Sequence, residues 1–294
     1  MNVPHKKLLS GFEMPVFGIG TWEMGGRTER NIANDDEADI EAVRRAIDVG
    51  ITHIDTAEKY AAGHAEVLVG QAITSTPRKD LFLVSKAAEG THHTPDGVKY
   101  ALEESLKRLQ TEYLDLYLLH TPTQDVDIKE TMRGMNALKD AGLIKNIGVS
   151  NFSVKQFESA QNASHAKIVA NQLHYNLAVR EIEHSRALEY YQDNDVMVIA
   201  WRPLQKSAIL IDGFETLSTI GKKYHKTPAQ VAINWLISQE NVVTISTMRN
   251  ANHLKENLGA IGWSMSREDQ EYLRLNFPNQ QSISDAVPLM NWVW

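Results

Sequence analysis

The chain has 294 residues, a formal charge of -7, 43% hydrophobic and 23% charged residues, and no cysteine. This length suits one large α/β barrel or two ordinary domains, and the composition is that of a globular protein. The lack of cysteine excludes a disulfide framework, a thiolate zinc site and a cysteine nucleophile. The negative charge argues against general nucleic-acid binding, so an anionic cofactor would need a local basic site.

No segment predicts contact with a membrane. Residues 1–15, MNVPHKKLLSGFEMP, lack the apolar core of a secretory signal, and no run approaches eighteen apolar residues. We therefore expect a cytoplasmic protein with no membrane partner. Its oligomeric state stays open.

Short apolar runs recur along the chain, and stretches of helical periodicity lie between them. The runs predict strands at residues 16–21, 51–56, 81–84, 114–119, 144–149, 168–170, 196–200 and 242–245. Helices are predicted at residues 35–49, 65–73, 94–109, 128–141, 153–163, 180–194, 228–238 and 250–260. This alternation predicts a single (β/α)8 TIM barrel domain over residues 1–294.

A doubly wound sheet is the competing fold. It is disfavoured because no G-x-G-x-x-G follows a strand, and the fragment at residues 18–20 lacks the third glycine. Two additions to the barrel are expected. Residues 7–14 predict an N-terminal hairpin, and residues 266–276 predict a further helix that leads into a C-terminal extension.

Polar residues follow most of the apolar runs. They are Asp55, Ser85-Lys86, His120, Ser150-Asn151, Asn171-Gln172 and Trp201-Arg202. In a barrel of this kind the carboxyl ends of the strands form the mouth, where active sites lie. The sequence therefore predicts that these side chains ring one cavity.

Tyr60, five residues after Asp55, indicates proton chemistry at this mouth. A phenol has a pKa near 10 and protonates a substrate well at neutral pH only if a nearby cation lowers that value. Lys86, held by Asp55, would supply the cation, and His120 would orient the same substrate oxygen. Each residue alone could be structural, as a rim ion pair or a core histidine, but their joint position favours catalysis.

Metal chemistry is not predicted. His92 and His93 are adjacent, but no third ligand lies at a suitable spacing, so a solvated loop is the better interpretation.

Seven ordered segments extend this pattern: GFEMPVFGIGTW (11–22), GITHIDTAEKY (50–60), LFLVSK (81–86), LDLYLLH (114–120), GLIKNIGVSNFS (142–153), NQLHYN (171–176) and HLKEN (253–257). With them the sequence resembles the aldo-keto reductase superfamily along nearly the whole chain. The resemblance implies a nicotinamide cofactor extended across the barrel mouth. It also implies a catalytic tetrad of Asp55, Tyr60, Lys86 and His120, with the tyrosine as general acid.

The resemblance also implies a set of cofactor contacts. Ser150, Asn151 and Gln172 would bind the carboxamide, and Trp201 would stack on the nicotinamide ring. Glu256 and Asn257 would hold the adenine. The remaining residues assigned to the cofactor are Thr21, Arg202, Leu204, Arg249 and Asn250.

The sequence departs from the family pattern at several places. The ring-stacking aromatic is commonly tyrosine but is Trp201 here, and Thr121 replaces a tryptophan that often follows the catalytic histidine. Thr247-Met248 replaces a frequent lysine-serine pair. Arg249 stands at the start of a predicted helix, a place favourable to a phosphate, so we expect NADP(H) over NAD(H), with NAD(H) as the alternative.

The substrate pocket is expected to involve Trp22, Thr121 and the apolar tail at residues 285–294, DAVPLMNWVW. The tail either packs outside the barrel or crosses the mouth, where Trp292 would face Trp22. Loops over the mouth set specificity in this fold.

The leading hypothesis is reversible reduction of small aliphatic, aromatic or sugar-derived aldehydes and ketones. A barrel glycosidase would require two carboxylates flanking the substrate bond, and the strand ends offer only Asp55. A cofactor-sensing regulatory subunit is the other alternative, because some members of the superfamily accompany ion channels.

Overall fold

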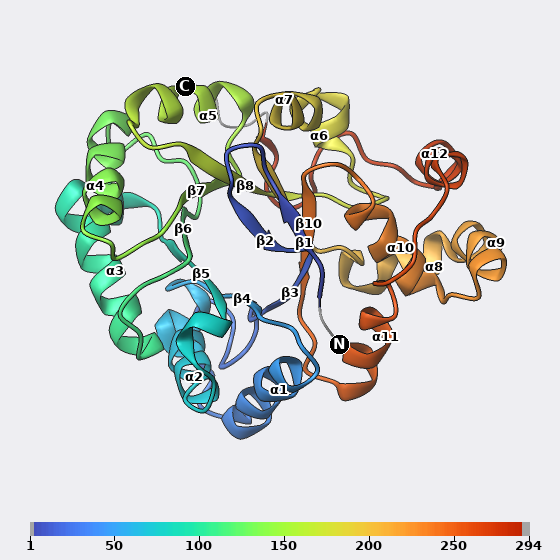
Figure 1. Ribbon diagram of the computed structural model, residues 1–294, viewed down its shortest axis with the longest axis horizontal. Helices are drawn as coiled ribbons and strands as arrows, with labels where there is room; N and C mark the ends of the chain where they lie inside the picture. Colours follow the sequence, from blue (N-terminus) through green and yellow to red (C-terminus); the bar gives the residue numbers. More distant parts are fainter. Residues whose placement is uncertain (1–2, 290–294) are drawn as a thin grey trace.

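The computed structural model describes residues 3–289, and its parallel strands close into a barrel surrounded by helices (Figure 1). The barrel strands are β3 (Phe17–Gly20), β4 (His53–Asp55), β5 (Phe82–Ala87), β6 (Leu116–Leu119), β7 (Ile147–Ser150), β8 (Ile168–His174), β9 (Met197–Trp201) and β10 (Val242–Ser246). They pair in the order β10-β3-β4-β5-β6-β7-β8-β9, and β9 also pairs with β10. The predicted (β/α)8 fold is thus confirmed.

The helices cover the outer face of the barrel (Figure 1). They are α1 (Asp36–Asp48), α2 (His64–Ala72), α3 (Pro95–Leu109), α4 (Ile128–Asp140), α5 (Val154–Ala163), α6 (Glu181–His184), α7 (Ala187–Asp193), α8 (Ala208–Asp212), α9 (Phe214–Tyr224), α10 (Pro228–Ile237), α11 (Ala251–Leu258) and α12 (Arg267–Asn276). The hydrophobic core lies between them and the strands. Within residues 3–289, no helix is long and apolar enough to cross a membrane.

Two strands extend further toward the mouth than predicted. β5 continues through Lys86 to Ala87, and β8 continues through Gln172 to His174. The prediction stopped each strand at its first polar residue. In the structure the strand pairing continues past these residues, so polarity did not mark the strand ends. Lys86 and Gln172 point into the mouth and bind Asp55, whereas Ser85 binds Glu66 on α2 and Asn171 binds Tyr191 on α7, outside the strands. The prediction that Ser85 and Asn171 line the mouth is therefore wrong, because alternate side chains of a strand face opposite sides.

The helical region after β8 also differs from the prediction. The single helix expected at residues 180–194 is divided into α6 and α7, with Arg186 in the left-handed region at φ 61°. Ser185 Oγ donates a 2.7 Å hydrogen bond to the Glu181 carbonyl at the end of α6. Helix α9 was not predicted, although Leu217, Ile220 and Gly221 form a buried face on it.

The predicted N-terminal hairpin is present as β1 (His5–Lys7) and β2 (Glu13–Pro15), and it closes the floor of the barrel (Figure 1). Lys6 Nζ donates to the Val242 carbonyl at the start of β10 over 2.7 Å. Phe12 packs edge-on against Phe82 at the start of β5, with ring centroids 6.1 Å apart. Because both contacts are at the amino ends of strands, only the opposite end of the barrel is left open as a mouth.

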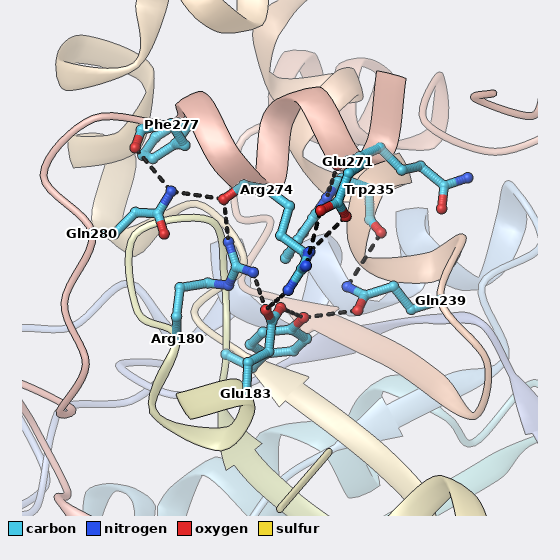
Figure 2. A network of polar contacts seen from close by, with 10 residues as sticks. Arg180, Glu183, Trp235, Gln239, Glu271, Arg274, Phe277 and Gln280 are labelled. Carbon is cyan, nitrogen blue, oxygen red and sulfur yellow. Dashed lines mark hydrogen bonds and ion pairs between the residues drawn. The ribbon is translucent and has the colours of Figure 1, made fainter. Parts of the chain in front are cut away.

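Helix α12 and the segment after it are fixed to the barrel by a polar network (Figure 2). Glu183 on α6 accepts hydrogen bonds from Arg180 and from Arg274 on α12, and Arg180 also lies 5.0 Å from the Trp235 ring. The Tyr175 hydroxyl donates to Glu183 from the end of β8. The side chain of Arg180 is only 3% exposed, so its charge depends on Glu183 for compensation.

We therefore predict that Glu183→Gln lowers the free energy of unfolding by about 2–4 kcal/mol, because it leaves the buried Arg180 without a counter-charge. Urea denaturation would measure the loss. Glu271→Gln is the matched control, since it removes only a half-exposed ion pair with Arg274 and should cost less than about 1 kcal/mol. Equal, small losses for both variants would show that the network does not stabilise the fold.

Candidate active site

A buried ion pair lies at the carboxyl ends of β4 and β5. Lys86 Nζ is 2.6 Å from Asp55 Oδ1 and donates a second hydrogen bond of 2.7 Å to the Thr56 carbonyl. Its distance to the Tyr60 hydroxyl is 3.4 Å. Asp55 and Lys86 are both fully buried. The three predicted residues are therefore brought together as the sequence analysis expected.

The position of Tyr60 is set by a strained turn. Residues Tyr60–Gly63 form a 3-10 turn in which Ala61 and Ala62 have φ angles of 51° and 52°. Their backbone N–H groups donate to the carbonyls of Arg27 (2.6 Å) and Thr28 (2.9 Å). Left-handed conformations cost energy for non-glycine residues and persist only where surrounding contacts impose them. The loop at residues 27–28 thus fixes the turn that points Tyr60 at Lys86.

Asp55 acts as a bridge across the barrel. Its second oxygen, Oδ2, accepts a 2.7 Å hydrogen bond from Gln172 Nε2 on β8. Thr21 Oγ1 donates to the Asp55 carbonyl over 3.1 Å. Because both carboxylate oxygens are engaged, this carboxylate is placed to orient Lys86 rather than to exchange a proton.

The direction of the Tyr60 pKa shift differs from the prediction. Burial raises the pKa of the phenol above its ordinary value, and the Lys86 ammonium offsets only part of that rise. Burial also lowers the pKa of Lys86, but Asp55 and Tyr60 outweigh it and the net pKa is raised. The predicted lowering of the Tyr60 pKa is therefore wrong for this structure, because burial cannot be read from the sequence. At neutral pH the phenol holds its proton and the lysine holds its charge.

His120 lies next to Tyr60, with ring centroids 5.7 Å apart in an edge-on arrangement. Burial and the nearby Lys86 charge lower the pKa of His120 to about 3, so the imidazole is neutral at pH 7. Its Nδ1 is buried and has no hydrogen-bond partner among residues 3–289. A neutral imidazole has one N–H, and this group can donate to a substrate oxygen without adding charge.

The predicted carboxamide contacts form a continuous edge beside the tetrad. Asn151 Nδ2 donates to the His120 carbonyl (3.1 Å) and to Ser150 Oγ (3.0 Å). Trp201 Nε1 donates to Asn151 Oδ1 over 3.3 Å, and Gln172 reaches Asp55 as described above. Ser150, Asn151, Gln172 and Trp201 thus lie together at the ends of β7, β8 and β9.

Trp201 is covered on one face by His174, a residue that the sequence analysis did not identify. The two rings are stacked, with centroids 4.1 Å apart and an interplanar angle of 10°. Arg202 lies 5.2 Å from the centroid of the same indole, and the half-buried Leu204 packs against the core nearby. The segment NQLH (171–174) could have predicted that His174 faces the same side as Gln172, because residues two apart on a strand share a face.

Arg249 is bound to an acidic partner. Its guanidinium pairs with Asp39 on α1, with Nε 2.6 Å from Oδ1 and Nη2 2.9 Å from Oδ2. Asp39 is buried, while the Arg249 side chain is 42% exposed. Asn250 caps α11, on which Glu256 and the buried Asn257 follow. Any phosphate bound here would share Arg249 with a carboxylate.

Two of the predicted substrate residues lie beside the tetrad. Trp22 packs edge-on against Tyr60, with centroids 5.0 Å apart. Thr121 Oγ1 donates to Glu89 over 3.1 Å, and Glu89 also pairs with Lys59. Trp292 lies outside the described residues. The described part of the tail reaches Gln205, where Asp285 accepts a 2.9 Å hydrogen bond.

The residues present fit a nicotinamide cofactor. Trp201 is partly exposed, and His174 covers one face of its indole. A planar ring that stacks on the other face would share the indole with the Arg202 guanidinium, which lies 5.2 Å from its centroid. The amides of Asn151 and Gln172 lie beside this indole. No cluster of three or more potential metal ligands occurs within the described part of the chain.

Comparisons with known proteins agree with this geometry. The family model for the Aldo/keto reductase family matches residues 16–274. Aldo-keto reductase family 1 member C18 of Rattus norvegicus is 33% identical, over 92% of this chain and 91% of its own.

Solved structures are similar as well. A thermostable aldo-keto reductase, Tm1743, solved with the inhibitor epalrestat, has a TM-score of 0.89 and 39% identity, covering 92% of this chain and 99% of its own. An aldo-keto reductase from Klebsiella pneumoniae, in complex with NADPH, has a TM-score of 0.84 and 33% identity, covering 96% of this chain and 97% of its own. With its barrel, its site geometry and these similarities, the chain belongs to the aldo/keto reductase family.

Proposed function

We propose that this oxidoreductase reduces an aldehyde or ketone to an alcohol with NADP(H), and that Tyr60 is its general acid. The observation that carries the proposal is the position of Lys86 Nζ between Asp55 and Tyr60, beside a neutral His120. The Klebsiella relative bound to NADPH supports the choice of cofactor.

The bound cofactor supplies a hydride to the carbonyl carbon. Tyr60 donates its phenolic proton to the carbonyl oxygen, and Lys86 stabilises the phenolate that remains. The His120 N–H donates to the same oxygen and fixes its direction. Asp55 keeps Lys86 in place, so the hydride and the proton arrive at a carbonyl held in one orientation.

The substrate pocket is proposed to have Trp22 and Thr121 as walls. Trp22 supplies an aromatic surface against Tyr60, and Thr121 supplies a small polar side chain next to His120. Trp292 is proposed to contribute from the tail. Small aliphatic, aromatic and sugar-derived carbonyls are the substrate classes to screen, with NADPH and NADH in parallel.

Tyr60→Phe should reduce kcat for carbonyl reduction by roughly 10²- to 10⁴-fold, because it removes the transferable proton and almost no volume. Following cofactor absorbance during turnover would measure this. The dissociation constant of NADPH should change little, since the phenol is not proposed to hold the cofactor. A variant with near wild-type kcat would show that another group is the acid.

Lys86→Met should impair both directions and shift the pH dependence of alcohol oxidation. Oxidation needs the phenolate, and the Lys86 ammonium offsets part of the rise that burial causes in the pKa of Tyr60. Without the lysine this pKa should be higher still, so the rise of the oxidation rate with pH should move to higher pH. Kinetic pH profiles would show the shift. Because Lys86→Met leaves the buried Asp55 without a counter-charge, the double variant Asp55→Asn/Lys86→Met serves as the charge-neutral control. An unmoved profile in both would refute the coupling.

Arg249→Ala should weaken NADPH binding more than NADH binding, since only NADPH carries the extra phosphate. A charge-assisted contact is worth roughly 1.5–3 kcal/mol, or about ten- to a hundredfold in affinity. Fluorescence titration with both cofactors would test this. Asp39→Asn is the comparison variant: it removes the carboxylate that binds Arg249 but keeps the arginine, so NADPH should still bind more tightly than in Arg249→Ala. Equal losses for NADPH and NADH in Arg249→Ala would contradict the role in phosphate binding.

A further inference from the structure

His174 is a buried histidine next to the mouth, and the proposed mechanism does not use it in proton transfer. It ends β8, two residues after Gln172, and is 4% exposed. Its ring lies flat against Trp201, at the stacking geometry given above. A parallel stack this close leaves one face of the indole unavailable to any ligand.

The hydrogen bonds of His174 define its orientation and its protonation. Nε2 is 2.8 Å from Gln205 Oε1, an acceptor, so Nε2 carries the proton. Nδ1 is 2.7 Å from Ser284 Oγ, which accepts from the N–H groups of Ala286 and Val287 and therefore donates its own proton to Nδ1. Both ring nitrogens are satisfied in the neutral form, which agrees with burial lowering the pKa of His174 to about 4.

The groups that hold His174 are themselves anchored. Ser284 belongs to the C-terminal extension, whose backbone N–H groups at Ser284 and Leu289 donate to the Glu181 carboxylate over 3.0 and 2.9 Å. Gln205 donates to Asp285 on the same extension. Next to His174 on β8, Tyr175 joins the outer network around Glu183 (Figure 2). The position of His174 is thus fixed by contacts that do not involve Trp201.

We propose that His174 is a positioning residue for the nicotinamide cofactor: it backs Trp201, and Ser284 and Asp285 of the C-terminal extension hold it there. This inference rests on the proposed stacking of the nicotinamide ring on Trp201. An indole backed on one side keeps a single orientation, so less motion is lost when the cofactor ring stacks on the other side. The extension would then influence cofactor affinity without touching the cofactor.

The test is a double-mutant cycle on NADPH affinity, measured by fluorescence titration of His174→Ala, Trp201→Ala and the double variant. Each single change should weaken NADPH about three- to tenfold, the range expected for an aromatic pair. In the Trp201→Ala background, His174→Ala should add no further loss. Adenosine 2′,5′-bisphosphate, which lacks the nicotinamide, is the control ligand and should bind all variants equally.

Two further variants keep the proposal testable if His174→Ala is unstable. His174→Phe retains a ring against Trp201 and should recover most of the lost affinity. Ser284→Ala removes the hydroxyl that holds Nδ1 and should weaken NADPH about twofold, only when Trp201 is present. A His174→Phe variant as weak as His174→Ala, or unchanged binding in Ser284→Ala, would overturn the proposed mechanism.

The outcomes also separate this inference from the proposed function. If Trp201→Ala leaves NADPH affinity unchanged, the stacking role of Trp201 fails and the inference fails with it. If Trp201→Ala weakens NADPH but His174→Ala does not, only the role of His174 fails. Equal weakening of NADPH and the bisphosphate would reveal a general structural loss and overturn the inference.

Discussion

The site depends on one buried ion pair, between Asp55 and Lys86. Taking two charges out of water costs several kcal/mol for each ion, and the cost is recovered only where good geometry and further hydrogen bonds satisfy both groups. Here the Thr56 carbonyl and the Tyr60 hydroxyl accept from the lysine, and Gln172 donates to the carboxylate. The same contacts that make the burial tolerable also place the phenol and connect β4, β5 and β8 across the mouth.

Much of this arrangement could be predicted from the sequence, since it follows from local pattern. The βα alternation predicted the barrel, and the polar residues after apolar runs predicted most members of the mouth, although Ser85 and Asn171 face the outer helices instead. Properties that depend on distant partners were not accessible. The buried environment that raises the Tyr60 pKa and the Asp39 carboxylate that binds Arg249 come from segments far apart in the chain. The ends of β5 and β8 were missed because the strands continue past their first polar residues, Ser85 and Asn171, which are buried and find polar partners on α2 and α7.

The pairing of Arg249 with Asp39 changes how its proposed contact with a phosphate should be understood. The arginine already has a buried carboxylate on Nε and Nη2, so its field at the phosphate position is partly cancelled. The carboxylate also fixes the guanidinium in one orientation, which lowers the entropy lost when an anion binds. These two effects oppose each other. The difference between the NADPH and NADH affinities therefore depends on Asp39 as well as on Arg249.

The C-terminal extension joins an outer network to the inner site, which bears on whether it covers the outside of the barrel or its mouth. Residue 281 pairs with Val179 on the outer side, close to the α6–α12 network. A few residues later, Ser284 and Asp285 reach His174 and Gln205 at the carboxyl ends of β8 and β9. Within the described residues the segment therefore runs along the outer side and reaches the residues next to the mouth, His174 and Gln205. The segment is anchored to the outer helices. Its hydrogen bonds hold His174, which stacks on the face of Trp201 opposite to the one proposed to meet the cofactor.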